Sequence, residues 1–216
     1  FCVQCHSPIA SLTDAITDHN NFSLLELNEM PLQIQEGVTC DVCHMVTHIP
    51  EPTDIETGSQ NFETVDFKYY TDGTRYGPID DPISNNFHSS EYHRGYDKSE
   101  FCQNCHNLTV NSVKAEVTQF EWEGTAFQAM GIECQTCHMP TYSGQASVDG
   151  PVRENLHRHF FPGADVQLNT PTPDPNHFSA VQSLLFEAAE LYINNINLNF
   201  DKNTIDLDII VTNNTG

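Results

Sequence analysis

The clearest hydrophobic pattern lies near the end of the chain, between residues 178 and 191. Apolar side chains recur there three or four positions apart, which places them on one face of an α-helix. The sequence therefore predicts one amphipathic helix in this segment. Its apolar positions are Phe178, Val181, Leu184, Leu185, Ala188 and Leu191.

A pattern with the period of a β-strand follows this helix. Ile205, Leu207, Ile209 and Val211 alternate with polar residues such as Asp206. Alternation puts the apolar side chains on one face of an extended chain, so we expect a half-buried strand in this part of the tail.

Turn-forming residues dominate the segments between the apolar runs. The stretch 50–86 predicts an irregular or hairpin-like segment, and residues 116–130 predict a further helix. The run Thr-Pro-Thr-Pro-Asp-Pro at residues 170–175 is typical of a stiff linker.

The composition changes this picture, because apolar residues are scarce for a chain of this length. Only 38% of the 216 residues are apolar, and the chain has 11 Gly and 12 Pro. A chain that buries so little of its own apolar surface needs another source of stability. We therefore expect something other than side chains to fill the interior.

The charge balance excludes two classes of partner. Thirty acidic residues against 8 basic ones give a formal net charge of −22. Nucleic acid and anionic lipid both bind basic surfaces, so we expect neither. A solvated acidic surface is the simplest interpretation, with adaptation to salty water or docking to a basic partner as alternatives. We expect no membrane span, because no apolar run is long enough.

All eight cysteines belong to four copies of one motif, Cys-x-x-Cys-His, numbered here as boxes one to four. On a helical turn, two thiols three positions apart reach the two vinyl groups of one haem as thioethers, and the next His ligates the iron. The motif predicts four covalently bound haems c. The thioether positions are Cys2, Cys5, Cys40, Cys43, Cys102, Cys105, Cys134 and Cys137, and the proximal iron ligands are His6, His44, His106 and His138.

Zinc sites and redox dithiols also use Cys-x-x-Cys, but neither requires a following His. Disulfide pairing is disfavoured too, because cysteines three positions apart are poor staples for long loops. With four haems in so short a chain, the macrocycles themselves would form the core. We expect a mostly irregular fold with little β structure, in which short α-helices surround four stacked haems and only the tail adds an amphipathic helix and a strand.

The boxes also reveal an internal repeat. Boxes one and three begin with Phe-Cys, whereas boxes two and four follow Gly and end in His-Met. We expect two haem-pair units, 1–45 and 101–139, each followed by a segment with distal ligands. Together they predict a tetrahaem domain over residues 1–169, with the linker, helix and start of a β segment at 170–216.

The sixth ligand of each iron decides whether the protein only carries electrons. Close pairs of His follow each haem-pair unit, and we expect these to be the distal ligands: His88, His93, His157 and His159. His19 and His48 are reserve candidates, and His177 is expected to cap a helix or face solvent. Met30 and Met130 stay open as ligands, whereas Met45 and Met139 point away from their own irons. Two imidazoles on every iron would leave no open face, which favours electron transfer at low potential.

The boxes and their flanks resemble the multihaem c-type cytochromes of anaerobic bacteria and archaea. The match covers most of residues 1–165 and is specific for the family rather than for one member. It is carried by Glu36–His44, Ser99–Asn107, Glu121–Trp122, Cys134–Pro140 and His159–Gly163, the last of which looks like the family's distal-His segment.

The resemblance implies an exported protein, in the periplasm, at the cell surface or outside the cell, that exchanges electrons with other redox proteins or cytochromes in anaerobic respiration. Some relatives polymerise into filaments in which a neighbouring subunit donates a distal His, so a homo-oligomer or conductive filament is a further expectation. Because Phe1 is not Met, we also expect the start of the chain to be missing. The tail after Thr170 resembles the beginning of an appended β-domain.

Two other functions stay open. One is a multihaem oxidoreductase of the nitrite or hydroxylamine type, whose catalytic iron keeps an open position. Such enzymes often use a Cys-x-x-Cys-Lys box, which this chain lacks, so we assign no catalytic residues. The other is a structural surface protein with haem as a scaffold, since Asn21, Asn107 and Asn213 begin matches to the glycosylation acceptor pattern.

Overall fold

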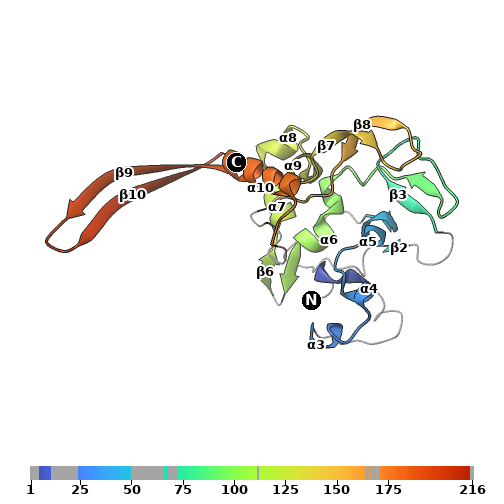
Figure 1. Ribbon diagram of the computed structural model, residues 1–216, viewed down its shortest axis with the longest axis horizontal. Coiled ribbons are helices and arrows are strands. Elements are labelled where there is room, and N and C mark those ends of the chain that lie inside the picture. The colour runs from blue at the N-terminus through green and yellow to red at the C-terminus, as the bar shows by residue number, and fades with distance from the viewer. Residues whose placement is uncertain are drawn as a thin grey trace. The chain divides into compact units, whose positions relative to one another are not determined.

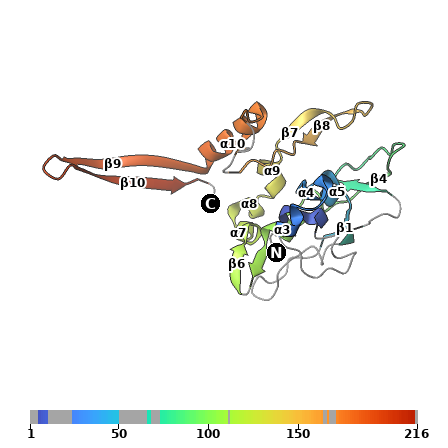
Figure 2. The ribbon, with the colours of Figure 1, turned by 60° about the horizontal axis from the view of Figure 1, so that its bottom comes forward.

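The described parts of all four boxes lie on short helical turns (Figure 1, with a second view in Figure 2). The computed structural model describes residues 5–10, 24–49, 66–67, 73–110, 112–163, 166 and 171–214. Cys2, His19 and the side chain of His48 lie outside the described residues. Box two forms α5 (Cys40–His44) and box four forms α9 (Cys134–His138). Box three follows the 3-10 turn η2 (Ser99–Phe101), and its last four residues form α6 (Gln103–His106).

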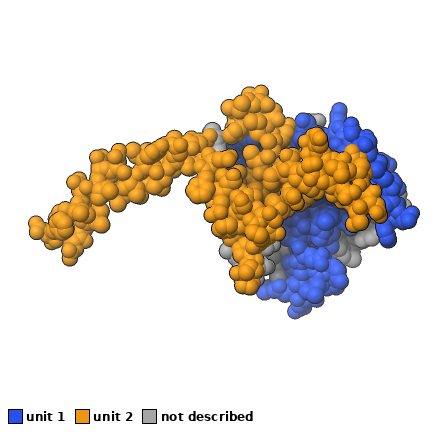
Figure 3. Space-filling view, turned by 45° about the horizontal axis from the view of Figure 1, so that its top comes forward, with its two compact units in different colours: residues 1–124 blue, residues 125–216 orange. Residues whose placement is uncertain are grey.

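The chain divides into two compact units, residues 1–124 and 125–216, which Figure 3 colours separately. Boxes one to three belong to the first unit and box four to the second. The boundary between the two units, after residue 124, does not coincide with the Pro-rich segment at 170–175, which the sequence predicts to be a linker. The tetrahaem domain over residues 1–169 stays a prediction.

The first unit combines short helices with three small two-stranded sheets. β1 (Val46–His48) pairs antiparallel with β2 (Asp66–Phe67), β3 (Arg75–Gly77) pairs in parallel with β4 (Ser90–Tyr92), and β5 (Leu108–Val110) forms a hairpin with β6 (Val113–Glu116). Its further helices are α3 (Leu24–Leu27), α4 (Leu32–Gln35) and α7 (Thr118–Trp122). The helix expected over 116–130 is divided into α7 and α8 (Ala126–Ala129), because Gly124 adopts a positive φ of 76°.

A small aromatic core packs beside box two. Val46, Tyr76 and Tyr96 are buried together, with Ile49 and Phe101 packed against them. The Tyr96 hydroxyl donates hydrogen bonds to the carbonyls of Cys43 (2.7 Å) and Val46 (2.9 Å). Burial raises the pKa of Tyr96 well above its ordinary value, so the phenol stays a donor. Tyr96 thereby joins α5 and β1 to the segment that leads into box three.

In the second unit a hairpin directly follows box four. β7 (Thr141–Gln145) pairs antiparallel with β8 (Val152–His157). The guanidinium of Arg158 lies over the ring of Tyr142, at 4.0 Å from its centroid. This cation–π contact holds the end of β8 against β7.

The amphipathic helix of the tail is α10 (Pro175–Ala188). Asp174 caps it, because its carboxylate accepts hydrogen bonds from the backbone amides of Asn176 (2.7 Å) and His177 (3.2 Å). Leu191, expected to belong to this helix, lies instead in β9 (Ala189–Asn199), which pairs with β10 (Thr204–Asn213). The segment after Ala188 is rich in Ile, Leu and Tyr, which suit a strand once a partner strand is available.

The expectation of a mostly irregular fold with little β structure is wrong. The described residues form five two-stranded sheets. Of the stretch 50–86, expected to be irregular or hairpin-like, residues 50–65 and 68–72 lie outside the described residues, and the rest contains β2 and β3. Elsewhere, polar residues close tight hairpins. Ser112, between β5 and β6, and Asn203, between β9 and β10, adopt positive φ values of 66° and 51°. No helix in the described ranges is long and apolar enough to cross a membrane.

Candidate functional site

In boxes two to four, at least one of the two residues between the cysteines, called the spacers here, has a buried side chain. The cysteines and the histidine of each box are more exposed to solvent. Side chains three and four positions apart share one face of a helical turn, so both thiols and the imidazole are presented together. This presentation fits a haem that docks onto the turn and is attached through both sulfurs. The buried spacers are Val42, Gln103, Asn104 and Gln135, and the exposed side chains include Cys40, His106, Cys137 and His138.

The imidazole of His44 is held in one orientation by the chain around it. Its Nδ1 lies 2.7 Å from the carbonyl oxygen of Tyr76 in β3, and the ring stacks on Tyr96 with centroids 5.9 Å apart and planes at 23°. A carbonyl only accepts, so Nδ1 carries the proton and Nε2 keeps its lone pair. This tautomer is the one a His ligand needs to bind iron through Nε2.

Box four repeats this arrangement in the second unit. Nδ1 of His138 lies 2.6 Å from the carbonyl oxygen of Pro162, again leaving Nε2 as the free nitrogen. Pro162 is fully buried, and the preceding Phe161 adopts a positive φ of 46°. The His159–Gly163 segment therefore positions a carbonyl for the proximal His of box four.

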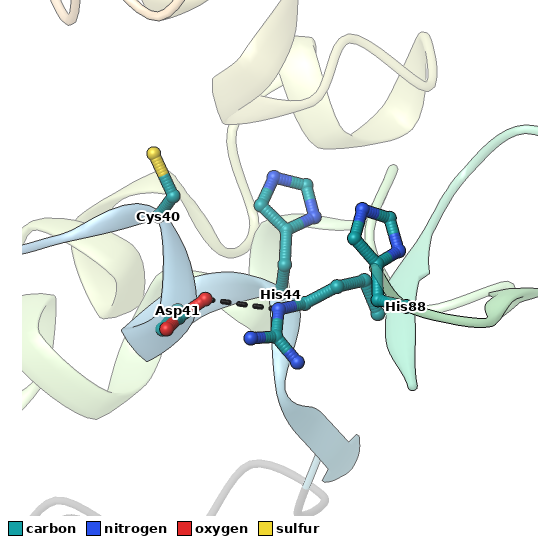
Figure 4. A pocket seen from close by; sticks show the side chains of 5 residues that line it. Cys40, Asp41, His44 and His88 are labelled. Carbon is teal, nitrogen blue, oxygen red and sulfur yellow. Dashed lines mark hydrogen bonds and ion pairs between the residues drawn. The ribbon is translucent and has the colours of Figure 1, made fainter. Parts of the chain in front are cut away.

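His88 meets box two at a cavity of about 380 Å³ (Figure 4). Nδ1 of His88 donates to the carbonyl of Ser89 (3.0 Å), and its Nε2 accepts from the side-chain amide of Asn85 (3.2 Å). The lone pair of His88 is thus on Nε2, but Nε2 already accepts from Asn85, so ligation through this nitrogen would break that hydrogen bond. The lining residues are Cys40, Asp41, His44, Arg75 and His88.

Arg75 and Asp41 form an ion pair beside this cavity, with 2.9 Å between Nε and Oδ1. The guanidinium also donates to the carbonyl of Gly73 (3.2 Å). Arg75 places a positive charge at a lining otherwise made of a thiol, a carboxylate and two imidazoles. Such a charge suits the propionate groups of a haem.

The other predicted distal ligands differ in how their nitrogens are engaged. Nδ1 of His157 donates to the carbonyl of Met139 (2.6 Å), which leaves Nε2 for a ligand. His93 uses both nitrogens, because Nε2 donates to the carbonyl of Thr47 (3.2 Å) and Nδ1 accepts from the amide of Gly95 (3.2 Å). The exposed ring of His159 lies edge-on to Phe161, with centroids 6.0 Å apart. His157 is therefore arranged as a ligand, whereas His88 and His93 would each have to break a hydrogen bond first.

Box three has a different neighbour. Nδ1 of the exposed His106 lies 3.9 Å from a carboxylate oxygen of Glu116 in β6. Partial burial acts to raise the pKa of Glu116, but hydrogen bonds from Thr118 and the nearby His106 hold this pKa below its usual value. Glu116 is therefore an anion beside the box-three imidazole near neutral pH.

The second cysteines of boxes one and three meet within the first unit. A hydrogen bond from Cys105 lowers the pKa of Cys5 to about 7, and the same bond together with burial raises the pKa of Cys105. Burial, followed by the charge of Cys40, raises the pKa of Cys43 to about 11. Conversion to thioethers would remove all of these ionisations.

Several residues that shape the sites have no sequence signal that identifies them. Tyr76, Pro162 and Met139 act through backbone carbonyls, which every residue carries, and Tyr96 acts through its position in the core. His177, expected to cap a helix or face solvent, contributes its backbone amide to the cap, while its half-buried ring lies edge-on to Phe160 at 6.4 Å.

Within the described ranges, no group of three or more His, Cys, Asp or Glu side chains could hold a bare metal ion. A haem supplies four ring nitrogens itself and needs only one or two imidazoles from the protein. Pairs of well-oriented His are therefore the relevant feature. Comparison of the chain with protein-family models, with curated proteins and with solved structures finds no match.

Proposed function

We propose that this protein is a c-type cytochrome that binds four haems covalently and transfers electrons between them. The observation that carries the proposal is the orientation of His44 and His138, each the residue directly after a Cys-x-x-Cys pair. In both, a backbone carbonyl accepts a hydrogen bond from Nδ1, so the lone pair of the ring is on Nε2. Neither a zinc-binding pair of cysteines nor a redox dithiol needs a following His in this state.

The proposal assigns the thioether positions to the eight cysteines and the proximal iron ligands to the four box histidines. His88 is the proposed distal ligand near box two, since it shares a cavity with Cys40 and His44. The bond from Nδ1 of His157 to Met139 supports its assignment as another distal ligand. His93 and His159 complete the distal set, with His19 and His48 in reserve.

Bound haem supplies an iron that takes up and releases one electron at a time. The chain supplies orientation and surroundings. The Tyr76 and Pro162 carbonyls keep the proximal imidazoles in one tautomer, and the Tyr96 ring covers one side of His44.

The small apolar core agrees with this proposal. The buried apolar side chains of the described residues are few, and much of the packing around the boxes is polar. A large flat macrocycle attached to each box would bury much more apolar surface than these side chains do. This supports the haems as the main hydrophobic component of the protein.

The proposed setting is outside the cytoplasm, in the periplasm, at the cell surface or beyond it, with other redox proteins or cytochromes as partners. The net charge of −22 favours partners with basic docking surfaces. Assembly into a conductive filament, with a distal His donated between subunits, is a finer part of the proposal. Electron micrographs and light scattering test it, and a monomer without fibres at high concentration would exclude the filament.

The first test is the intact mass of the protein produced in a host that attaches haem c. The denatured chain should exceed its polypeptide mass by four haems, and a chain with both Cys40 and Cys43 changed to Ala should lose one. A mass equal to that of the polypeptide alone, under conditions in which a known c-type cytochrome is loaded, would overturn the proposal.

One observation favours a second candidate, a multihaem oxidoreductase with one open iron. Because His88 and His93 each engage both ring nitrogens, an iron could lack a distal ligand in this conformation. Carbon monoxide distinguishes the two, since it binds ferrous haem only at an open or easily vacated position. A shift of the reduced spectrum at one iron in four would favour the enzyme, and an unchanged spectrum the electron carrier.

A further inference from the structure

The hairpin formed by β9 and β10 has one face on which the side chains from Leu191 to Leu198 and from Ile205 to Val211 are all aliphatic, with Asn213 only at its end. The strand register pairs Leu198 with Ile205, Ile193 with Ile209, and Leu191 with Val211. The register shifts between Asp206 and Asp208, which lets aliphatic residues on both sides of the irregularity fall on the same face. The eight residues of this aliphatic face are Leu191, Ile193, Ile196, Leu198, Ile205, Leu207, Ile209 and Val211.

The opposite face of the same hairpin is polar. It carries Asp206 opposite Asn197, Asp208 opposite Asn194, and a single apolar pair formed by Tyr192 and Ile210. The acidic groups of the hairpin interior thus all point away from the aliphatic face. The chain as a whole is acidic, but the aliphatic face carries no acidic side chain that would repel a second copy.

The aliphatic face is exposed along its whole length. Its eight side chains keep between 42% and 63% of their surface accessible. Figure 1 shows the two strands running side by side as a long ribbon that continues from α10. A two-stranded ribbon is only marginally stable in water unless a hydrophobic face is packed against something. An exposed aliphatic surface of this size marks an interaction site.

We propose that the aliphatic face packs against the same face of a second copy of this chain. Eight half-exposed aliphatic side chains offer several hundred Å² per chain, which approaches the roughly 800 Å² per partner of a stable interface. Interfaces within homodimers are rich in apolar groups and poor in charge, whereas transient redox contacts are smaller and more polar. The composition of this face therefore fits a lasting contact between identical chains.

The pairing is isologous, so the same residues meet across a two-fold axis and the contact closes on itself. Two hairpins stacked face to face form a small β-sandwich whose polar faces point to solvent. The hairpin therefore forms dimers, and a filament would need a second, head-to-tail surface. This inference does not rest on haem binding, because it uses only the hairpin.

Neighbouring residues of β10 provide a matched test. Ile209 lies on the aliphatic face and Ile210 on the polar face, with exposed fractions of 58% and 47%. Ile209→Asp puts two carboxylates into the paired interface and should weaken self-association by on the order of a hundredfold. Ile210→Asp should leave self-association within about twofold of the unmodified protein, because its side chain points to solvent.

The measurement is the mass of the haem-loaded full chain by light scattering, over a dilution from high micromolar to nanomolar concentrations. A dimer for the unmodified chain and for Ile210→Asp, with a monomer for Ile209→Asp, supports the proposal. An unmodified chain that is monomeric at every concentration overturns it, and so does an equal effect of both substitutions. Far-ultraviolet circular dichroism shows whether each variant keeps its fold. If a variant unfolds, the dilution series of the unmodified chain still tests the proposal.

Discussion

Boxes two and three carry the same motif in the same unit, but their histidines have different surroundings. His44 is half-buried, hydrogen-bonded to a neutral carbonyl and stacked on Tyr96, whereas His106 is exposed and lies 3.9 Å from the carboxylate of Glu116. The motif fixes the spacing of the two thiols and the imidazole, and it leaves the surroundings of each His to residues elsewhere in the chain. If haems occupy both boxes, their stabilities and potentials should differ for these reasons.

The largest expected effect comes from replacing the histidines of boxes two and three, one at a time. His44→Ala should leave one iron in four high-spin and lower the free energy of unfolding by about 3 kcal/mol, because the buried Tyr76 carbonyl and the Tyr96 ring both lose a partner. His106→Ala should also make one iron high-spin, but with a change in stability below about 1 kcal/mol. Electron paramagnetic resonance and urea unfolding measure both quantities, and equal losses of stability would contradict the comparison.

Tyr96→Phe tests the core that supports box two. The substitution leaves the Cys43 and Val46 carbonyls without this donor and should lower the free energy of unfolding by about 1–3 kcal/mol. Tyr92→Phe, at an exposed side chain in β4, is the control and should change stability by less than about 0.5 kcal/mol. Chemical unfolding followed by circular dichroism measures the two variants, and a neutral Tyr96→Phe would show that the hydroxyl is dispensable.

Glu116→Gln sharpens the electrostatic half of the comparison. Removing an anion beside His106 makes the oxidised iron less stable, so the potential of the box-three haem should rise by roughly 10–40 mV, the equivalent of an exposed charge pair. The reduction potentials of the other three haems should change less. Spectroelectrochemical titration measures this, and a fall in potential or a uniform shift of all four haems would refute the assignment.

The smallest expected effect is that of Arg75→Ala. Its ion pair with Asp41 is partly exposed, so its loss should lower the free energy of unfolding by less than about 1 kcal/mol. The absorption spectrum of the box-two haem should respond more than stability does, because Arg75 lines the cavity beside Cys40 and His44. Thermal unfolding and difference spectra at low and high salt check both parts.

The parts of the fold that were predictable are those with a strong local signal. The helix at Pro175–Ala188 follows from apolar spacing, although its first residue was expected to belong to the linker. The strand at Thr204–Asn213 follows from alternation, but it is exposed on both faces, so the expectation that it is half-buried is wrong. β9 was missed because Leu191 extends the helical spacing by one more step, although a strand partner was available to the segment after Ala188. The small sheets of the first unit were missed because strands of two to four residues carry too few side chains to show a period.

The sequence by itself determined where a haem could be attached, because thiols and imidazole three and four positions apart are brought together by one helical turn, whatever surrounds it. Only the tertiary structure decided which nitrogen of each imidazole carries the proton. That choice depends on the Tyr76, Pro162 and Met139 carbonyls, which lie 32, 24 and 18 positions from His44, His138 and His157. A backbone carbonyl has no residue type, so long-range packing alone can place it.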